Sequence, residues 1–414
     1  MVMPLKVMVV DDTITYRMIM KKVAESIPGI QVMATLSNGK LALDKITSLF
    51  AAKDPTCPDV VLLDVEMPVM DGLTSLREIA KRFPGLTVIM VSGLSRSNAN
   101  IIMECLNAGA LDFITKPMES NVDRAKDALR KDLEPILSVI IKERGDGGGG
   151  SAAAVAEGER AEKPAVSVSE GGTASVVVPP RVQGVKPGMP APARVPPPMV
   201  AKPPAVRIKP SGHGQQVKGA ASDAPGLILV GSSTGGPAAL TRLLARIGCK
   251  LPVPMLIVQH MPPVFTASLA AQLSRTSGLD VREAKDDQAL EPGDVIVAQG
   301  GRHMTLVEEN RKLKVMLNDG PKVNECRPAV DVLFMSAVAC FSGRILAVVL
   351  TGMGRDGANG VDALKRMGRT FCITQDQKTC VVYGMPRSVD EKGLSDLSLP
   401  LDEIGPKIAE MCGC

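Results

Sequence analysis

Two serines and a threonine, whose hydroxyls could carry out chemistry, stand among three glycines after a short apolar run in the segment LILVGSSTGGP, residues 227–237 of the 414-residue sequence. Gly231, Ser233 and Gly235 match the pattern G-x-S-x-G, which places a serine hydroxyl on a sharp turn between a strand and a helix. Pro237 suits the first turn of that helix, because this position needs no backbone N–H. The pattern predicts that Ser233 is a nucleophile, provided that a base lies beside it.

Two other glycine-rich loops begin in a similar way, and both fit this segment less well. A phosphate-binding loop needs a lysine after its second glycine, but Pro237 follows Gly236 here. A dinucleotide-binding loop needs a glycine where Ser233 stands. It also needs an acidic residue at the end of the next strand, which here ends in Gln259 and His260. We therefore favour the nucleophilic serine.

A serine nucleophile needs a base and an orienting acid, and few residues of this sequence could fill these two roles. Of the three histidines, His260 and His303 each follow an apolar run, and their spacing alone does not decide which one is the base. Asp356 is the best candidate for the orienting acid, because it lies in VVLTGMGRDG, where a long apolar run ends in a glycine-rich loop. Free N–H groups in that loop are suited to stabilise an oxyanion. An aspartate that only orders a glycine turn is the alternative.

A second group of polar side chains lies in the first third of the sequence. Three apolar runs end in Asp11-Asp12, in Asp64 and in Ser92, and a fourth runs into Lys116. The carboxyl ends of parallel strands meet at one sheet edge, so these groups are expected to lie together. Clustered carboxylates favour a hard cation such as Mg²⁺, which leaves Asp64 as the nucleophile toward a phosphoryl group. Taken singly, the aspartates could instead cap helices, and the lysine could mark a turn.

Both groups lie in stretches where strand and helix patterns alternate, which predicts two α/β domains with doubly wound parallel sheets. We expect a flavodoxin-like first domain and a Rossmann-like second domain with an added hairpin, which includes the strand 312–319. The other expected strands are 6–10, 32–36, 59–65, 87–92, 112–116, 227–231, 253–259, 294–299 and 345–352. The expected helices are 15–27, 38–50, 73–83, 97–108, 121–143, 236–247, 264–276, 329–341 and 357–367.

The two domains are expected at residues 1–125 and 223–414, with a connecting helix at 126–144. Residues 145–222 contain no Phe, Trp, Tyr or Leu and hold 12 of the 32 prolines. Such a segment cannot bury enough apolar surface to offset its ordering entropy, so we predict a disordered linker.

Composition narrows the possible partners and locations. The formal net charge of +4 is too small to indicate a nucleic-acid partner, and no apolar run is long enough to cross a bilayer. We therefore expect no nucleic acid, no direct membrane insertion and a cytoplasmic location. The nine cysteines are scattered without regular spacing, which favours reduced thiols over a disulfide framework.

The first domain resembles the response-regulator receiver domains. The resemblance covers residues 4–125 and is carried by the motifs VVDD, LLDVEMPVMDG, VSG and DFITKP. It implies that Asp64 is the phosphoacceptor and that a histidine kinase is the phosphodonor. It also implies a Mg²⁺ site formed by Asp11, Asp12, Asp64 and the backbone carbonyl of Glu66, and a switch formed by Ser92, Lys116 and Phe113.

The second domain is similar to the catalytic domain of chemotaxis-type protein-glutamate methylesterases, which also deamidate specific glutamines. The resemblance spans about 226–400 and rests on GSSTGGP, VQHMP, PGDV, GGRHM, DGPKVNECRPAVDVLF, LTGMGRDG and CVVYGMPR. It implies that Ser233 is the nucleophile, His260 the base and Asp356 the orienting acid. Thr234 and the backbone of Met353 would line the site and its oxyanion hole.

The order receiver, linker, esterase is also that of this family. The resemblance implies that the substrates are methylated cytoplasmic helices of chemoreceptors, and that the esterase reaction needs no cofactor. The alternative function is a response regulator with a DNA-binding or other non-enzymatic output domain. The output part shows no helix-turn-helix pattern, which favours the enzyme.

Overall fold

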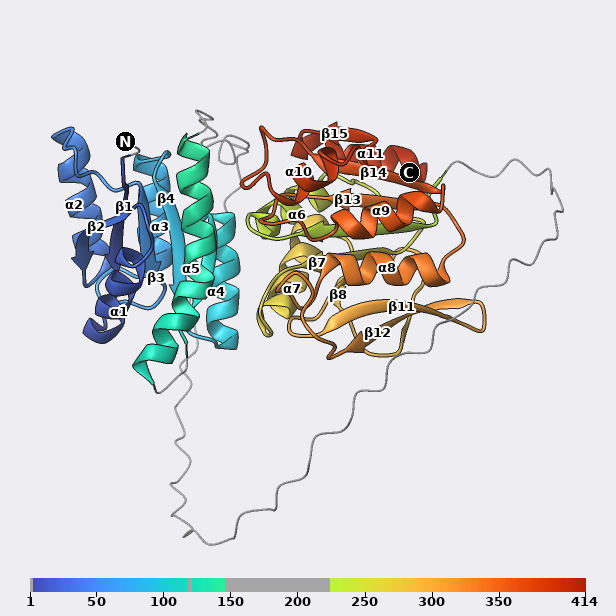
Figure 1. The fold of residues 1–414 in the computed structure, drawn as a ribbon, viewed down its shortest axis with the longest axis horizontal. Coiled ribbons are helices and arrows are strands. Elements are labelled where there is room, and N and C mark those ends of the chain that lie inside the picture. Colours follow the sequence, from blue (N-terminus) through green and yellow to red (C-terminus); the bar gives the residue numbers. More distant parts are fainter. Residues whose placement is uncertain (1–2, 118–120, 146–223) are drawn as a thin grey trace, which may run out of the picture. The chain divides into compact units, whose positions relative to one another are not determined.

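The computed structural model describes residues 3–117, 121–145 and 224–414. The linker predicted at 145–222 therefore lies outside the described residues, except for Gly145 at the end of a helix. Figure 1 shows two α/β parts, one coloured from blue to green and the other from yellow to red. Among the described residues, no helix is long and apolar enough to span a membrane.

The first part is a five-stranded parallel sheet with the strand order β2-β1-β3-β4-β5. This order is that of a flavodoxin-like fold, as predicted. Its strands are β1 (Leu5–Val10), β2 (Ile30–Leu36), β3 (Val60–Asp64), β4 (Thr87–Ser92) and β5 (Asp112–Thr115). Its helices are α1 (Ile14–Glu25), α2 (Gly39–Ala51), α3 (Gly72–Arg82), α4 (Arg96–Asn107) and α5 (Val122–Gly145).

The central strands of this sheet are apolar on both faces because helices cover both. Val7 and Val9 of β1 lie in a core with residues of α1 and α5. Met8 and Val10 point to the other face and lie in a core with residues of α2, α3 and α4. All four side chains are fully buried, and each such burial stabilises the fold by about 1.5–3 kcal/mol.

Helix α5 belongs to this core along most of its length. It begins at Val122, and Leu129, Leu133 and Leu137 are buried in the same cluster as α1 and β1. A boundary at residue 125 would therefore cut through a continuous helix. The segment expected as a connecting helix forms part of the packing of the first sheet.

The second part is built on a seven-stranded sheet with the order β15-β14-β13-β6-β7-β10-β8, in which all neighbouring strands are parallel. Its strands are β6 (Leu227–Ser232), β7 (Met255–Gln259), β8 (Val281–Glu283), β10 (Val295–Val297), β13 (Ile345–Val349), β14 (Thr370–Gln375) and β15 (Leu397–Leu399). Its helices are α6 (Gly236–Ala245), α7 (Phe265–Ser277), α8 (Val330–Cys340), α9 (Ala358–Arg366), α10 (Met385–Asp390) and α11 (Leu401–Cys412).

The predicted hairpin is the larger part of a separate antiparallel sheet. Strand β11 (His303–Glu309) pairs with β12 (Lys312–Asn318), and the short β9 (Gln288–Ala289) adds a third strand. Leu306 and Val315 face the main core from this sheet and are buried there. The hairpin therefore covers one side of the second part, where β11 also packs on α8.

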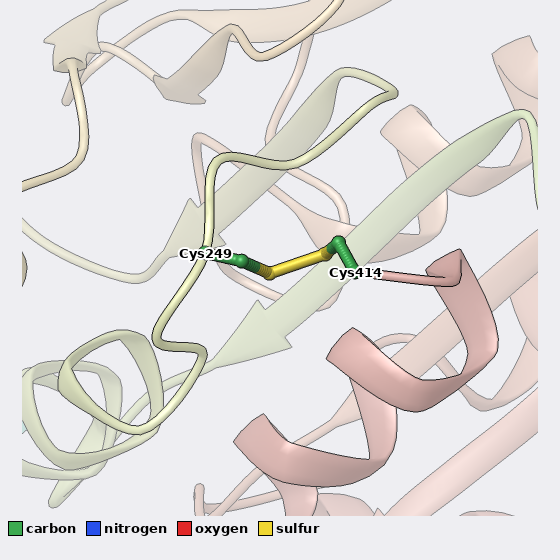
Figure 2. Close-up of a disulfide and its surroundings, with 2 residues drawn as sticks. All are labelled: Cys249 and Cys414. Atoms are coloured by element: carbon green, nitrogen blue, oxygen red, sulfur yellow. A yellow bond between two sulfur atoms is a disulfide. The ribbon is translucent and has the colours of Figure 1, made fainter.

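The expectation that all cysteines are reduced thiols is wrong for one pair. Cys249, between α6 and β7, and Cys414, after α11, form a disulfide, which Figure 2 shows in close-up. The two residues are 165 positions apart in sequence, yet their Cα atoms are 6.0 Å apart because α11 packs on α6. Irregular spacing along the chain does not report such proximity. The bridge ties the end of the chain to the loop that follows α6.

Candidate active site and phosphoacceptor site

Ser233 lies on a tight turn between β6 and α6. Strand β6 ends at Ser232, and helix α6 begins at Gly236, so only three residues make the connection. Gly235 has a φ of +75°, a conformation that side chains with a Cβ rarely adopt. A Cβ on Gly236 would lie 1.9 Å from Oε1 of Gln259. Gly235 and Gly236 of GSSTGGP are thus required by the turn that presents the serine.

His260 lies beside Ser233 because the two strands that carry them are neighbours. Ser232 of β6 pairs with Gln259 of β7, so Ser233 and His260 are each the next residue after a paired position. The His260 N–H donates to the Ser232 carbonyl at 3.1 Å. The Gln259 amide N–H donates to the carbonyls of Ser233, at 2.9 Å, and of His260, at 3.1 Å. One buried amide therefore fixes both strand ends.

Asp356 reaches the same place from the loop after β13, the other neighbour of β6. Its Oδ2 lies 2.8 Å from Nε2 of His260, and the side chain is 2% exposed. The N–H groups of Val330 and Asp331 donate to its two oxygens at 2.6 and 3.1 Å. Burial raises the pKa of Asp356, but the hydrogen bonds and the charge of His260 outweigh this and hold the pKa below its ordinary value.

The contact with Asp356 assigns the protons of His260. An ionised carboxylate only accepts, so Nε2 carries the hydrogen and, in the neutral ring, Nδ1 is the acceptor. Burial lowers the pKa of His260, but the Asp356 carboxylate and Cys326 together raise it to about 9. A base with these partners is well oriented, and its proton affinity is high.

Three residues of the motif DGPKVNECRPAVDVLF also build this site, and sequence reasoning did not identify them. The Asn324 amide donates to Oδ1 of Asp356 at 2.8 Å and to Oδ2 of Asp331 at 3.0 Å. Asp331 accepts in addition from the N–H groups of Gly357 and Gly360, which fixes the loop that carries Asp356. Sγ of Cys326 lies 3.4 Å from Nδ1 of His260.

The loop after β13 also lies against the serine. A Cβ on Gly352 would come within 2.8 Å of Cβ of Ser233, so only glycine permits this approach. The Thr351 hydroxyl donates to the Thr234 carbonyl at 3.0 Å and holds the two loops together. Among the described residues, no intramolecular hydrogen bond occupies the N–H of Thr234 or of Met353. Both N–H groups are therefore available to an oxyanion.

The structure brings His260, rather than His303, to Asp356. His303 begins β11 in the antiparallel sheet, is 2% exposed, and has its Nε2 2.9 Å from the Pro321 carbonyl. Within the described ranges, neither Ser233 nor Asp356 hydrogen-bonds to His303. Ser233 itself makes no hydrogen bond to His260 in the described part of the chain, since Nδ1 faces Cys326.

The second group of polar side chains meets at the carboxyl edge of the first sheet. Carboxylate oxygens of Asp11, Asp12 and Asp64 lie within 4.8 Å of one another. Nζ of Lys116 is 2.7 Å from Oδ2 of Asp11 and 2.7 Å from Oδ2 of Asp64. Three acidic oxygens at this spacing, two of them on buried residues, suit a small hard cation.

Burial and the neighbouring charges both shift the pKa values of Asp64 and Lys116. Burial raises the pKa of Asp64 to about 6, although the Lys116 ammonium opposes the shift. Burial lowers the pKa of Lys116, but the carboxylates of Asp11 and Asp64 outweigh it and raise the pKa above its ordinary value. Lys116 therefore holds a full positive charge beside the carboxylate that is expected to react.

The remaining predicted residues of the first part lie around this cluster. Ser92 ends β4, is buried, and its carbonyl accepts from the Lys116 N–H at 2.7 Å. Phe113 lies on β5 and pairs with Met90 of β4. Glu66 is exposed and lines a cavity of about 480 Å³ beside the carboxylates. Asp12, Val65, Met67, Pro68, Asp71, Leu73 and Ile101 line the rest of this cavity.

Two family models match the chain over separate ranges. The response regulator receiver domain matches residues 7–127, and the CheB methylesterase matches residues 228–408. The first range contains the carboxylate cluster with Lys116, and the second contains Ser233, His260 and Asp356.

Two named proteins are similar to almost the whole chain, and one crystal structure is similar to less than half of it. The protein-glutamate methylesterase/protein-glutamine glutaminase of group 2 operon from Rhodopseudomonas palustris is 38% identical over 99% of this chain and 94% of its own length. A protein-glutamate methylesterase/protein-glutamine glutaminase from Desulfotalea psychrophila is 36% identical over 98% of this chain and 97% of its own length. The crystal structure of the Thermotoga maritima CheB methylesterase catalytic domain is 41% identical, covers 45% of this chain and 99% of its own, and gives a TM-score of 0.44.

Proposed function

This chain belongs to the protein-glutamate methylesterase/protein-glutamine glutaminase family, and we propose that Ser233, His260 and Asp356 carry out its hydrolysis. The chain is a hydrolase that combines a receiver domain with a methylesterase domain, which fits regulated demethylation of chemoreceptors. The observation that carries the proposed triad is the 2.8 Å contact of His260 with buried Asp356 beside the Ser233 turn. Methanol release from methylated chemoreceptors by the full chain tests the activity.

The proposed reaction begins at the hydroxyl of Ser233. Its oxygen attacks the γ-carbonyl carbon of a methylated glutamate while Nδ1 of His260 takes its proton. Asp356 stays ionised, holds Nε2–H in place and stabilises the imidazolium that forms. For this step the serine hydroxyl takes the place of the Cys326 thiol at Nδ1. Asn324 and Asp331 keep the orienting acid in position through the bonds described above.

The tetrahedral intermediate needs donors for its negative oxygen. The unoccupied N–H groups of Thr234 and Met353 are the candidates, and each donor of this kind contributes about 3–4 kcal/mol to the transition state. His260 then returns the proton to the leaving methanol. Water hydrolyses the acyl enzyme by the same steps in reverse, and a glutamine side chain would release ammonia in place of methanol.

The receiver domain implies phosphorylation, which in such domains generally depends on Mg²⁺. We propose that Asp11, Asp12, Asp64 and the Glu66 carbonyl hold the ion, which would neutralise the phosphoryl oxygens when bound. Asp64 is the proposed acceptor, and Ser92, Lys116 and Phe113 are proposed to respond to the new charge. A histidine kinase as donor, cytoplasmic receptor helices as substrate and a cytoplasmic location complete the proposal.

The esterase rate is expected to rise with pH because the base must be neutral to accept the serine proton. The pKa of His260 is raised to about 9, so its neutral fraction should fall about tenfold per pH unit below that value. The groups that face its ring are Asp356 and Cys326. The measurement is kcat/KM for methanol release between pH 6 and 9, with the Ser233→Ala variant as the blank for spontaneous hydrolysis. A flat profile over this range would contradict the assigned base.

Phosphorylation of the receiver is expected to raise esterase activity. A modification can change activity only through a free-energy difference between two states of the protein, and such couplings typically amount to about 5-fold or more. We expect a small acyl phosphate to raise methanol release by the full chain to this extent, and the 226–414 fragment to be similarly active without it. Equal rates for the fragment, the full chain and the treated chain would show that the receiver does not inhibit the esterase.

A further inference from the structure

Cys326 occupies an unusual position for a thiol in a serine hydrolase. Its Sγ lies 3.4 Å from Nδ1 of His260, and Nε2 of the same ring lies 2.8 Å from Asp356. The three side chains form a continuous thiol, imidazole and carboxylate series. The acceptor nitrogen that Ser233 needs is the one that Cys326 occupies.

The backbone holds Cys326 in this place through a two-residue turn. Val323 and Cys326 exchange N–H···O bonds of 3.1 and 2.9 Å across the turn. Its central residues, Asn324 and Glu325, have φ values of +50° and +62°, which turns of this type require and which is unfavourable for glutamate. The same turn directs Asn324 to Asp356. The loop therefore keeps an unfavourable conformation while it delivers a thiol to one end of the base and an amide to its acid.

Three other free thiols in the described ranges show what burial does to a cysteine. Cys105 and Cys372 are buried, and burial raises the pKa of each thiol to about 12. Burial also raises the pKa of Cys340, which like Cys326 is partly exposed. Cys326 is partly exposed and touches an imidazole, which is the environment that makes a cysteine reactive.

We propose that Cys326 is a modification site at which a small hydroperoxide reversibly inactivates the esterase. The inference rests on the proposed role of His260 as the base. A thiol beside an imidazole that is held by a carboxylate is also the arrangement that activates the cysteine nucleophile of other hydrolases. The ligand class is hydrogen peroxide or a small alkyl hydroperoxide, which are small enough to reach a thiol that is only partly exposed.

The reaction balances with the groups present. In the fraction of molecules in which His260 is neutral, Cys326 transfers its proton to Nδ1, and the thiolate attacks the terminal oxygen of the hydroperoxide. An S–O bond forms as the O–O bond breaks, so sulfur is oxidised by two electrons and the peroxide is reduced. The imidazolium of His260 returns the proton to the leaving hydroxide or alkoxide. The products are a sulfenic acid at Cys326 and water or an alcohol.

The added oxygen would block Nδ1 of His260, the nitrogen that acts as the general base. A sulfenic acid is larger than a thiol and can hydrogen-bond to Nδ1, so the Ser233 hydroxyl could no longer approach that nitrogen. A small thiol would condense with the sulfenic acid to a mixed disulfide and water. A second thiol would then reduce this disulfide and release the Cys326 thiol, which restores the site.

The test uses the full chain and three proteins: the wild type, Cys326→Ser and the matched control Cys340→Ser. Each is treated with hydrogen peroxide and dimedone, and the adducts at Cys326 and Cys340 are quantified by mass spectrometry. We expect Cys326 to be labelled at least about tenfold faster than Cys340, because its thiolate is formed by the adjacent imidazole. Methanol release is measured before and after treatment, as a fraction of each protein's own starting rate.

Peroxide should reduce that fraction about tenfold or more in the wild type and in Cys340→Ser, and leave most of it in Cys326→Ser. Equal losses in all three proteins would overturn the proposal, as would labelling of Cys326 no faster than that of Cys340. The labelling ratio does not depend on esterase activity. A wild type without methanol release before treatment would therefore contradict the proposed function alone.

Discussion

Replacement of Ser233 by alanine should reduce methanol release from methylated chemoreceptors by about 10⁴- to 10⁶-fold, because removing one member of a triad removes the function of all three. Replacement of His260 by glutamine should have an effect of similar size. The two losses should not add in the double variant, since the nucleophile and the base act in one step. The measurement is kcat/KM for each variant with the same receptor preparation.

The chain offers a matched control in the other histidine of the second part, His303. His303→Gln removes a buried imidazole whose hydrogen-bond partner in the described part of the chain is the Pro321 carbonyl, to which a glutamine amide can still donate. We expect this variant to retain most of the activity. If His303→Gln were inactive and His260→Gln nearly normal, the base would be misassigned. If Ser233→Ala kept the wild-type rate, the serine mechanism itself would be wrong.

Near Ser233, the sequence predicts the local backbone structure. The run LILV, the glycines and Pro237 determine a strand, a turn and a helix start within eleven residues, and the structure has all three there. The choice between His260 and His303 could not be made in this way, because both follow apolar runs. The register of β6 with β7 and the path of the loop after β13 bring His260 to Asp356.

The contacts that sequence reasoning missed are long-range or depend on unusual backbone conformations. Cys326 is 66 residues from His260, and it reaches the ring only through a turn with positive φ at two residues that are not glycine. Strands β8 and β15 have three residues each, too few for an alternation of apolar and polar positions to be seen. The Cys249–Cys414 bridge depends on α11 packing on α6, which no local pattern encodes.

The receiver was predictable in more detail because its candidate site residues all lie at or directly after the ends of strands in a simple alternating pattern. Asp64 ends β3 and Ser92 ends β4, while Lys116 follows β5 directly. A parallel sheet places such residues at one edge without further information. The helix α5 was harder to assign, because its apolar residues continue well past the point where the receiver motifs end.

Replacement of Asp64 by asparagine should abolish phosphorylation of the chain. The amide oxygen of asparagine is a far weaker nucleophile than a carboxylate. The Asp64 carboxylate is buried beside the Lys116 ammonium, which would hold the oxygens of an incoming phosphoryl group. We expect incorporation of label from a radioactive small acyl phosphate to fall to background in Asp64→Asn. The control is Asp44→Asn, which alters an exposed aspartate paired with Lys40 and should be labelled like the wild type.

The same labelling experiment tests the proposed cation. Asp11, Asp12 and Asp64 place three acidic oxygens within 4.8 Å of one another, and Lys116 contacts two of these carboxylates with its single positive charge. An incoming phosphoryl group would add further negative charge, so the reaction should require a divalent ion to offset it. We expect EDTA to remove wild-type labelling and excess Mg²⁺ to restore it. Undiminished labelling in EDTA would contradict the metal site, and strong labelling of Asp64→Asn would identify a different acceptor.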